Sequence, residues 1–126
     1  MTQKLNALAS YRELRVWNRA MDLVVVSYQV SRRLPAEERF GLTSQIRRAA
    51  VSIPANIAEG YGRRRRGDYL QHLSIANGSL KELETHFLIT LRLGHLTQDE
   101  IQPILELASD VGKMLRSMMQ RLEAER

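Results

Sequence analysis

Apolar residues recur at alternating spacings of three and four along most of this chain, which is the period of an amphipathic helix. A first helix is predicted from residue 11, where Ser10 and Glu13 have the spacing of a capping box. It should end near Arg33, because Pro35 disfavours helical geometry in the residue before it. Two apolar rows lie side by side on it, so its buried face should be wide and should touch more than one neighbour. The rows are Leu14, Trp17, Met21, Val24 and Tyr28, and Val16, Ala20, Leu23, Ser27 and Val30.

A second helix is predicted from about Thr43 to about Tyr61, and it contains a proline. Pro54 removes one backbone hydrogen bond and crowds the carbonyl group of Ala50, which costs about 3 kcal/mol unless packing compensates. A kink between these two residues is therefore expected. The apolar row of this helix consists of Leu42, Ile46, Ala50, Ile53 and Ile57.

Two further helices follow. The third should begin near Gly67 or Asp68 and end at Gly94. The fourth should begin after Thr97, which forms a second predicted capping box with Glu100. Their apolar rows are Leu73, Ala76, Leu80, Leu83, Phe87 and Leu91 on the third, and Ile101, Ile104, Ala108, Val111, Leu115, Met118 and Leu122 on the fourth.

No strand pattern competes with these four helices, so the fold class is all-α. Short connections between long helices make neighbours antiparallel, which predicts an up-down-up-down four-helix bundle. We expect residues 11–126 to form this single domain, with the second helix kinked at Pro54. Residues 1–10 have little pattern and are expected to form a flexible N-terminal arm.

Polar residues form a row beside the apolar row on both the second and the third helix. Buried polar groups need partners, so these rows predict a hydrogen-bonded network within the bundle or between subunits. A catalytic or ligand pocket is the alternative, but no nucleophile, base and orienting group stand together, and no catalytic residue is assigned. The predicted network comprises Gln45, Ser52, Asn56, Glu59, Ser79 and Glu82.

The composition gives no indication of disulfides, metal sites or membrane spans. The chain has no cysteine, so disulfides and thiolate metal sites are excluded. The Glu-x-x-His spacing of di-iron bundles does not occur, because Glu82 and His86 are four residues apart. No metal or other cofactor is therefore expected. No segment approaches the roughly 18 apolar residues of a membrane span, so a soluble cytoplasmic protein is expected.

The net charge of +5 is unevenly distributed. Residues 1–66 hold 13 basic and 5 acidic residues, which gives +8, whereas residues 67–126 hold 6 basic and 9 acidic residues, which gives −3. Such asymmetry favours a polyanionic partner on the first half, usually nucleic acid. A solvated basic face, or attraction between the two halves, is the alternative.

Arginine dominates the basic half. Arg63, Arg64, Arg65 and Arg66 follow one another at a helix junction, and Arg47 and Arg48 lie one helix away. The planar guanidinium group presents a fork of donors that suits phosphate oxygens. These six arginines are the candidate nucleic-acid-binding residues. Tyr61 and Tyr69 flank the run and could stack on unpaired bases, although core packing is the alternative for both.

With these residues read, the chain resembles a bacterial family of small four-helix proteins encoded within intervening sequences of 23S ribosomal RNA genes. The resemblance extends from about Leu14 to Leu122. The matching segments are Leu14-Arg15-Val16-Trp17, Pro35 to Leu42, Gln45, Arg47-Arg48-Ala49, Ser52 to Gly60, Ala76, Gly78-Ser79 and Glu82-Leu83-Glu84. The family usually has one arginine and then mixed polar residues after Gly62, so the full run of four is a departure.

The resemblance implies an antiparallel four-helix bundle that assembles as a homopentamer. It also implies kinship with the accessory variability protein of diversity-generating retroelements, a basic pentamer that binds reverse transcriptase and nucleic acid. We therefore expect a non-enzymatic, oligomeric nucleic-acid-binding or scaffold protein, with structured RNA as the partner. Two alternatives stay open: an adaptor for a reverse transcriptase or another protein, and a HEPN-like ribonuclease using Arg66 and His72.

Overall fold

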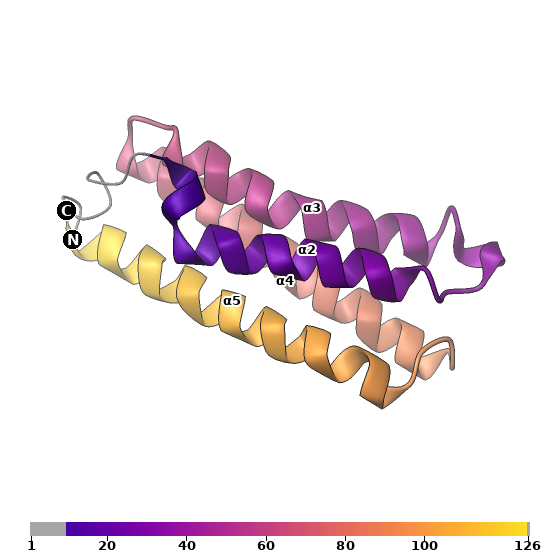
Figure 1. Ribbon diagram of the computed structural model, residues 1–126. Coiled ribbons are helices and arrows are strands. Elements are labelled where there is room, and N and C mark those ends of the chain that lie inside the picture. The colour runs from indigo at the N-terminus through magenta and orange to yellow at the C-terminus, as the bar shows by residue number, and fades with distance from the viewer. Residues whose placement is uncertain (1–9, 126) are drawn as a thin grey trace.

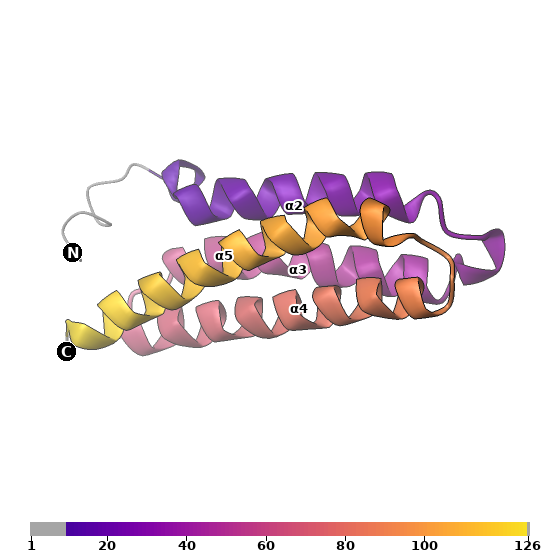
Figure 2. The same ribbon diagram turned by 90° about the horizontal axis from the view of Figure 1, so that it is seen from below.

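The computed structural model describes residues 10–125, and four long helices make up most of them. Consecutive helices run in opposite directions (Figures 1 and 2), and both α2 and α4 pack against α3 and α5. No strand occurs among the described residues, which confirms the predicted all-α four-helix fold. The elements in chain order are η1 (Tyr11–Glu13), α2 (Arg15–Ser31), η2 (Ala36–Glu38), α3 (Leu42–Tyr61), α4 (Arg66–Arg92) and α5 (Gln98–Ala124).

The core contains one apolar row from each helix. On α3, α4 and α5 the buried apolar residues are largely those of the predicted rows. On α2 the second predicted row is the more deeply buried: Ala20 and Leu23 are fully buried, whereas in the first row Met21 is 38% exposed and Val24 is partly buried against the core. Trp17 of the first row is partly buried and packs edge-on against the ring of Tyr11, with 5.3 Å between ring centres. One side of α2 is thus only partly covered within a single chain.

The two predicted capping boxes have different outcomes. The box at Thr97 is confirmed: its Oγ1 accepts from the Glu100 N–H at 3.2 Å, and its own N–H donates to Glu100 Oε1 at 2.9 Å. The prediction of a capping box at Ser10 is wrong. Ser10 Oγ accepts from the Arg12 N–H and caps η1, because extended geometry at Leu14 separates that turn from α2. Residues 1–9 of the predicted arm lie outside the described residues.

Pro54 lies inside α3, and the helix continues on both sides of it. Pro54 is buried, as are Ala50 and Ile53 of the same helix. Burial of this apolar face provides the packing that offsets the missing backbone hydrogen bond. The kink at Pro54 stays a prediction.

Two carboxylates tie together the connections at one end of the bundle. Glu38 Oε1 accepts from the Leu42 N–H at 3.2 Å, and its Oε2 lies 3.1 Å from Nε2 of His95, in the connection between α4 and α5. Two hydrogen bonds lower the pKa of Glu38 from its ordinary value of 4.5. The larger effect comes from the Leu42 N–H and the smaller from His95. In the same way, the Thr97 N–H and then Arg33 lower the pKa of Glu100.

Acid should weaken the fold through Glu38. A carboxylate whose pKa is lowered by folding stabilises the protein above its unfolded pKa of 4.5, and this contribution is lost as the pH falls through the folded pKa. The Glu38→Gln variant should therefore be less stable than wild type at pH 7 and should differ little at pH 3, as measured by urea unfolding. The control is Glu37→Gln, at an exposed position of the same turn. An equal loss at both pH values would contradict the ionic role of Glu38.

Candidate nucleic-acid interface

The four consecutive arginines, Arg63 to Arg66, form what we call the arginine turn, between α3 and α4. Arg63 donates through Nη2 to Glu59 Oε1 at 2.9 Å, one helical turn earlier. Arg64 and Arg65 are exposed, and within residues 10–125 neither forms an ion pair. Arg66 begins α4 and is partly buried. Among residues 10–125, the turn therefore presents two guanidinium groups without a carboxylate partner.

The start of α4 adds to the positive potential of this turn. Its N-cap residue, Arg65, makes no side-chain capping bond, so backbone N–H groups of the first turn lack that partner. A helix N-terminus carries about half a positive charge, and anions are favoured there. Asp68, in the first turn, offsets part of this charge. A phosphate group near Arg65 would meet guanidinium groups and a helix N-terminus together.

The other predicted pair of arginines lies elsewhere on α3. Arg47 donates through Nε to Ser31 Oγ at 3.1 Å, and its guanidinium carbon lies 4.7 Å from the centre of the Tyr28 ring. Arg48 is exposed. At 1.5 Å per residue, Arg47 is about 21 Å along the helix axis from Tyr61, the last residue of α3 before the arginine turn. Figure 1 shows the α2–α3 and α3–α4 connections at opposite ends of the bundle. The six predicted arginines thus form two groups.

Arg47 and Arg48 line an open groove of about 700 Å³ beside the start of α3, which we call the α3 groove. Two residues that sequence reasoning missed, Arg39 and Phe40, belong to it. A signal for Phe40 was available, because it is an aromatic residue outside every apolar row. The lining residues are Tyr28, Arg39, Phe40, Thr43, Ser44, Arg47, Arg48, Val51 and Ser52.

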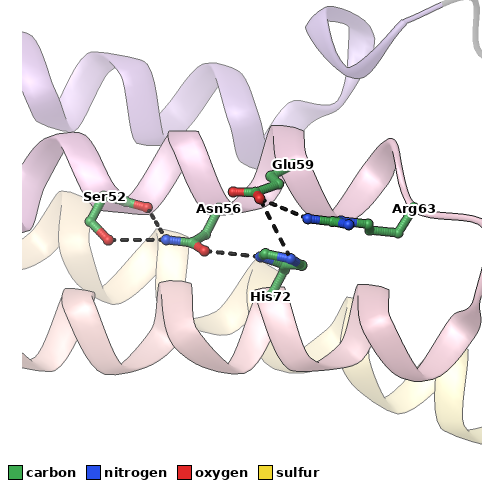
Figure 3. Close-up of polar contacts among 5 residues, drawn as sticks. All are labelled: Ser52, Asn56, Glu59, Arg63 and His72. Carbon is green, nitrogen blue, oxygen red and sulfur yellow. Dashed lines mark hydrogen bonds and ion pairs between the residues drawn. The ribbon is translucent and has the colours of Figure 1, made fainter.

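A chain of polar side chains joins α3 to α4 (Figure 3). Ser52 and Ser79 share a hydrogen bond of 2.8 Å between their hydroxyl groups. Asn56 Nδ2 donates to the carbonyl oxygen of Ser52 at 2.9 Å and to its Oγ at 3.1 Å. Asn56 Oδ1 lies 3.0 Å from His72 Nδ1, and His72 Nε2 lies 4.0 Å from Glu59. These contacts connect the two helices from Ser79 to the arginine turn.

Not every predicted member lies in this chain of contacts. Ser52, Asn56, Glu59 and Ser79 are brought together, and His72 and Arg63 join them. Gln45 is exposed near the other end of α3. Glu82 contacts His86 on its own helix, at 3.2 Å.

The hydrogen bonds determine which nitrogen of the neutral His72 ring carries the proton. Because Asn56 Nδ2 donates to Ser52, its Oδ1 faces His72 and can only accept. Nδ1 of His72 must therefore be the donor, which leaves Nε2 with a lone pair. The ring borders a hollow of about 250 Å³ lined by Arg63, Asp68, Gln71, His72 and Ile75. Arg66 is not among these residues, and the lining includes no serine, threonine or cysteine.

Of the two predicted stacking tyrosines, Tyr69 is a core residue. It is 8% exposed, its hydroxyl group lies 3.6 Å from Met118 Sδ, and burial raises its pKa to about 12. Tyr61 is partly buried and meets the Tyr69 ring edge-on, with 6.3 Å between ring centres. Tyr69 therefore cannot stack on a base in this structure.

Across residues 10–125, no three histidine, aspartate or glutamate side chains gather as metal ligands. Over the same residues, no helix has the length and apolar character needed to cross a membrane.

Comparisons with known proteins agree with this fold. The sequence model of the 23S rRNA-intervening sequence proteins matches residues 12–117. A crystal structure of a protein of unknown function from the S23 ribosomal protein family of Bacteroides thetaiotaomicron VPI-5482 is similar, with a TM-score of 0.77 and 26% identity. That similarity covers 82% of this chain and 97% of the other. No curated protein matches the sequence significantly. On its residues and its fold, the chain belongs to the 23S rRNA-intervening sequence protein family.

Proposed function

We propose that this protein is a non-enzymatic, oligomeric RNA-binding protein whose arginine turn contacts the phosphate backbone. The observation that carries the proposal is that Arg64 and Arg65 are exposed at the start of α4 without a carboxylate partner within the described residues. RNA is favoured among polyanions because the family takes its name from intervening sequences of 23S rRNA. Structured RNA offers the dense phosphates that such a turn would bind.

The local charges support this assignment. Arginine at a helix N-terminus does not offset the positive end of the helix dipole, so neither Arg65 nor Arg66 stabilises α4 in this way. A bound phosphate would reduce the repulsion between these arginines and the positive end of the helix, and it would accept hydrogen bonds from their guanidinium groups. Glu59 holds Arg63 close to the helix end, which positions one guanidinium group of the turn.

The test is the salt dependence of RNA binding. Each phosphate contact contributes about 0.7–0.9 to the slope of log K against log salt concentration. The double variant Arg64→Ala/Arg65→Ala should therefore reduce the slope by about 1.4–1.8, as measured by fluorescence anisotropy with a labelled RNA hairpin. The control, Arg92→Ala/Arg116→Ala, removes the same charge from two exposed positions elsewhere on the bundle. Equal slopes in wild type and the Arg64/Arg65 variant would refute the assignment of the turn.

Self-assembly is the second part of the proposal. The outer side of α2 exposes Met21 and Val25, at 38% and 53%, and apolar surface of this kind favours contact with another subunit. A pentamer, implied by family resemblance, would repeat the arginine turn five times around a ring and strengthen binding through avidity. Sedimentation should then give a particle of five times the 14.5 kDa chain mass.

The two alternative functions can be separated with the same samples. Recovery of a reverse transcriptase with the protein from cells, without RNA, would favour the adaptor. RNA shortened by wild type but not by His72→Ala would favour a ribonuclease. Against the ribonuclease, Arg66 is not among the residues that line the hollow beside His72.

A further inference from the structure

Phe40 is the most exposed large apolar side chain among the described residues. It is 89% exposed, whereas Phe87, the other phenylalanine of the chain, is fully buried. Phe40 stands just before α3, at the mouth of the α3 groove. The Arg39 guanidinium carbon lies 5.4 Å from the centre of its ring. An aromatic ring held in solvent beside a cation contributes little to the core and is free to contact a ligand.

The groove beside Phe40 carries positive charge. Arg39, Arg47 and Arg48 line it, and none of its described lining residues is a carboxylate. Glu38, which precedes Arg39 in the sequence, accepts a hydrogen bond from the Leu42 N–H and contacts His95. Hydroxyl groups of Thr43, Ser44 and Ser52 complete the polar lining.

Arg47 is held in place before any ligand arrives. Its guanidinium group stacks over the Tyr28 ring, and its Nε donates to Ser31 Oγ. Arginine has five N–H donors, so four remain for a ligand. Because the side chain is already ordered, binding costs less conformational entropy than it would for a freely moving arginine.

We propose that the α3 groove binds unpaired nucleotides of RNA, with phosphates on Arg39, Arg47 and Arg48 and a base stacked on the ring of Phe40. This inference rests on the proposed RNA-binding function and adds the class of RNA. Every base has a π-face that an aromatic ring can cover, and a basic groove beside exposed aromatic rings is typical of proteins that bind single strands. In a duplex the base faces are already stacked, so Phe40 has no face to meet. An acidic peptide would match the charge but would leave the exposed ring without a stacking partner.

The test compares a labelled oligouridine with an RNA duplex of similar length, using the full chain. Stacking on an aromatic ring contributes about 1–3 kcal/mol per base, so Phe40→Ala should weaken oligouridine binding about 5- to 150-fold. Duplex binding should change less than about twofold, because the duplex offers no base to the ring. Phe40→Tyr keeps the ring and should restore oligouridine binding. Leu93→Ala, at another exposed apolar residue, is the matched control.

Several outcomes would overturn this inference. If Phe40→Ala binds oligouridine like wild type while Arg64→Ala/Arg65→Ala binds RNA more weakly, the groove assignment is wrong and the proposed function stands. If wild type binds neither RNA, both fall. A smaller particle mass for Phe40→Ala in sedimentation would show that a second copy of the chain occupies the groove. Tighter binding of polyglutamate than of oligouridine would show that the groove takes acidic peptides.

Discussion

Truncation of Phe87 to alanine should lower the free energy of unfolding by about 3–5 kcal/mol, the usual cost of removing a buried aromatic side chain. Phe87 is fully buried in the core on α4, so the lost ring leaves a cavity that the packed helices can fill only in part. Single domains of ordinary stability have about 5–15 kcal/mol in total, so this variant could lose most of it. Urea unfolding followed by circular dichroism measures the change.

The same truncation at Phe40 provides a matched control within one chain. Phe40 is 89% exposed, so Phe40→Ala removes the same atoms without opening a cavity and should change stability by about 0.5 kcal/mol or less. If the Phe40→Ala protein is folded, weaker oligouridine binding by this variant can be assigned to the loss of the ring. A large loss at Phe40 would indicate that its ring is covered in solution, and similar losses at both positions would contradict the burial described for Phe87.

Replacement of Gly60 by alanine should destabilise the protein by about 1–3 kcal/mol, because the helices α3 and α4 touch at this point. A Cβ atom on Gly60 would lie 2.8 Å from His72 Cβ and 3.0 Å from a ring carbon of Tyr69. His72 Cβ is fixed to the α4 backbone, so the clash can be relieved only by moving one helix away from the other. Such a movement would also strain the bond between His72 and Asn56.

Gly78 is the matched control for Gly60, since it lies on α4 and a Cβ atom there would meet no atom within 4 Å. Gly78→Ala should gain about 0.5–1 kcal/mol, because alanine loses less backbone entropy in a helix than glycine does. Thermal unfolding of both variants tests the pair. If Gly60→Ala were as stable as Gly78→Ala, the close approach of α3 and α4 would be wrong. A loss at Gly78 would instead point to a neighbouring subunit against α4.

The helices could be predicted from sequence because each carries a long apolar row, whose period depends only on helix geometry. The start of α2 could not be predicted, because the Ser10–Glu13 spacing fits a capping box. In the structure, the extended backbone of Leu14 ends the first turn, and α2 begins after it. The deeper burial of the second row of α2 was also not predictable, since both rows have the same period and were expected to form one wide buried face. That difference depends on contacts with α3 and α5, which a single helix pattern does not contain.

The candidate site was less predictable than the fold. The polar rows that contain Ser52, Asn56 and Ser79 could be read from the sequence. Which residues of these rows touch each other depends on how α3 pairs with α4. That pairing leaves Gln45 and Glu82 out of the chain of contacts. The six arginines looked like one group, because Arg47 and Arg48 lie only one helix away from the arginine turn in the sequence. Sequence separation on a helix translates into distance along its axis, which placed them in different groups.

The separation of the two arginine groups determines how long a helical nucleic-acid strand must be to reach both. Arg48 and Tyr61, the last residue of α3, are 13 residues apart and thus about 20 Å apart along the helix axis, and the arginine turn begins two residues after Tyr61. A nucleic-acid strand in a helical conformation advances about 3.4 Å per phosphate, so about six nucleotides in that conformation are needed to bridge them. Shorter oligonucleotides would engage one end at a time, and affinity should rise in a step once the bridging length is passed.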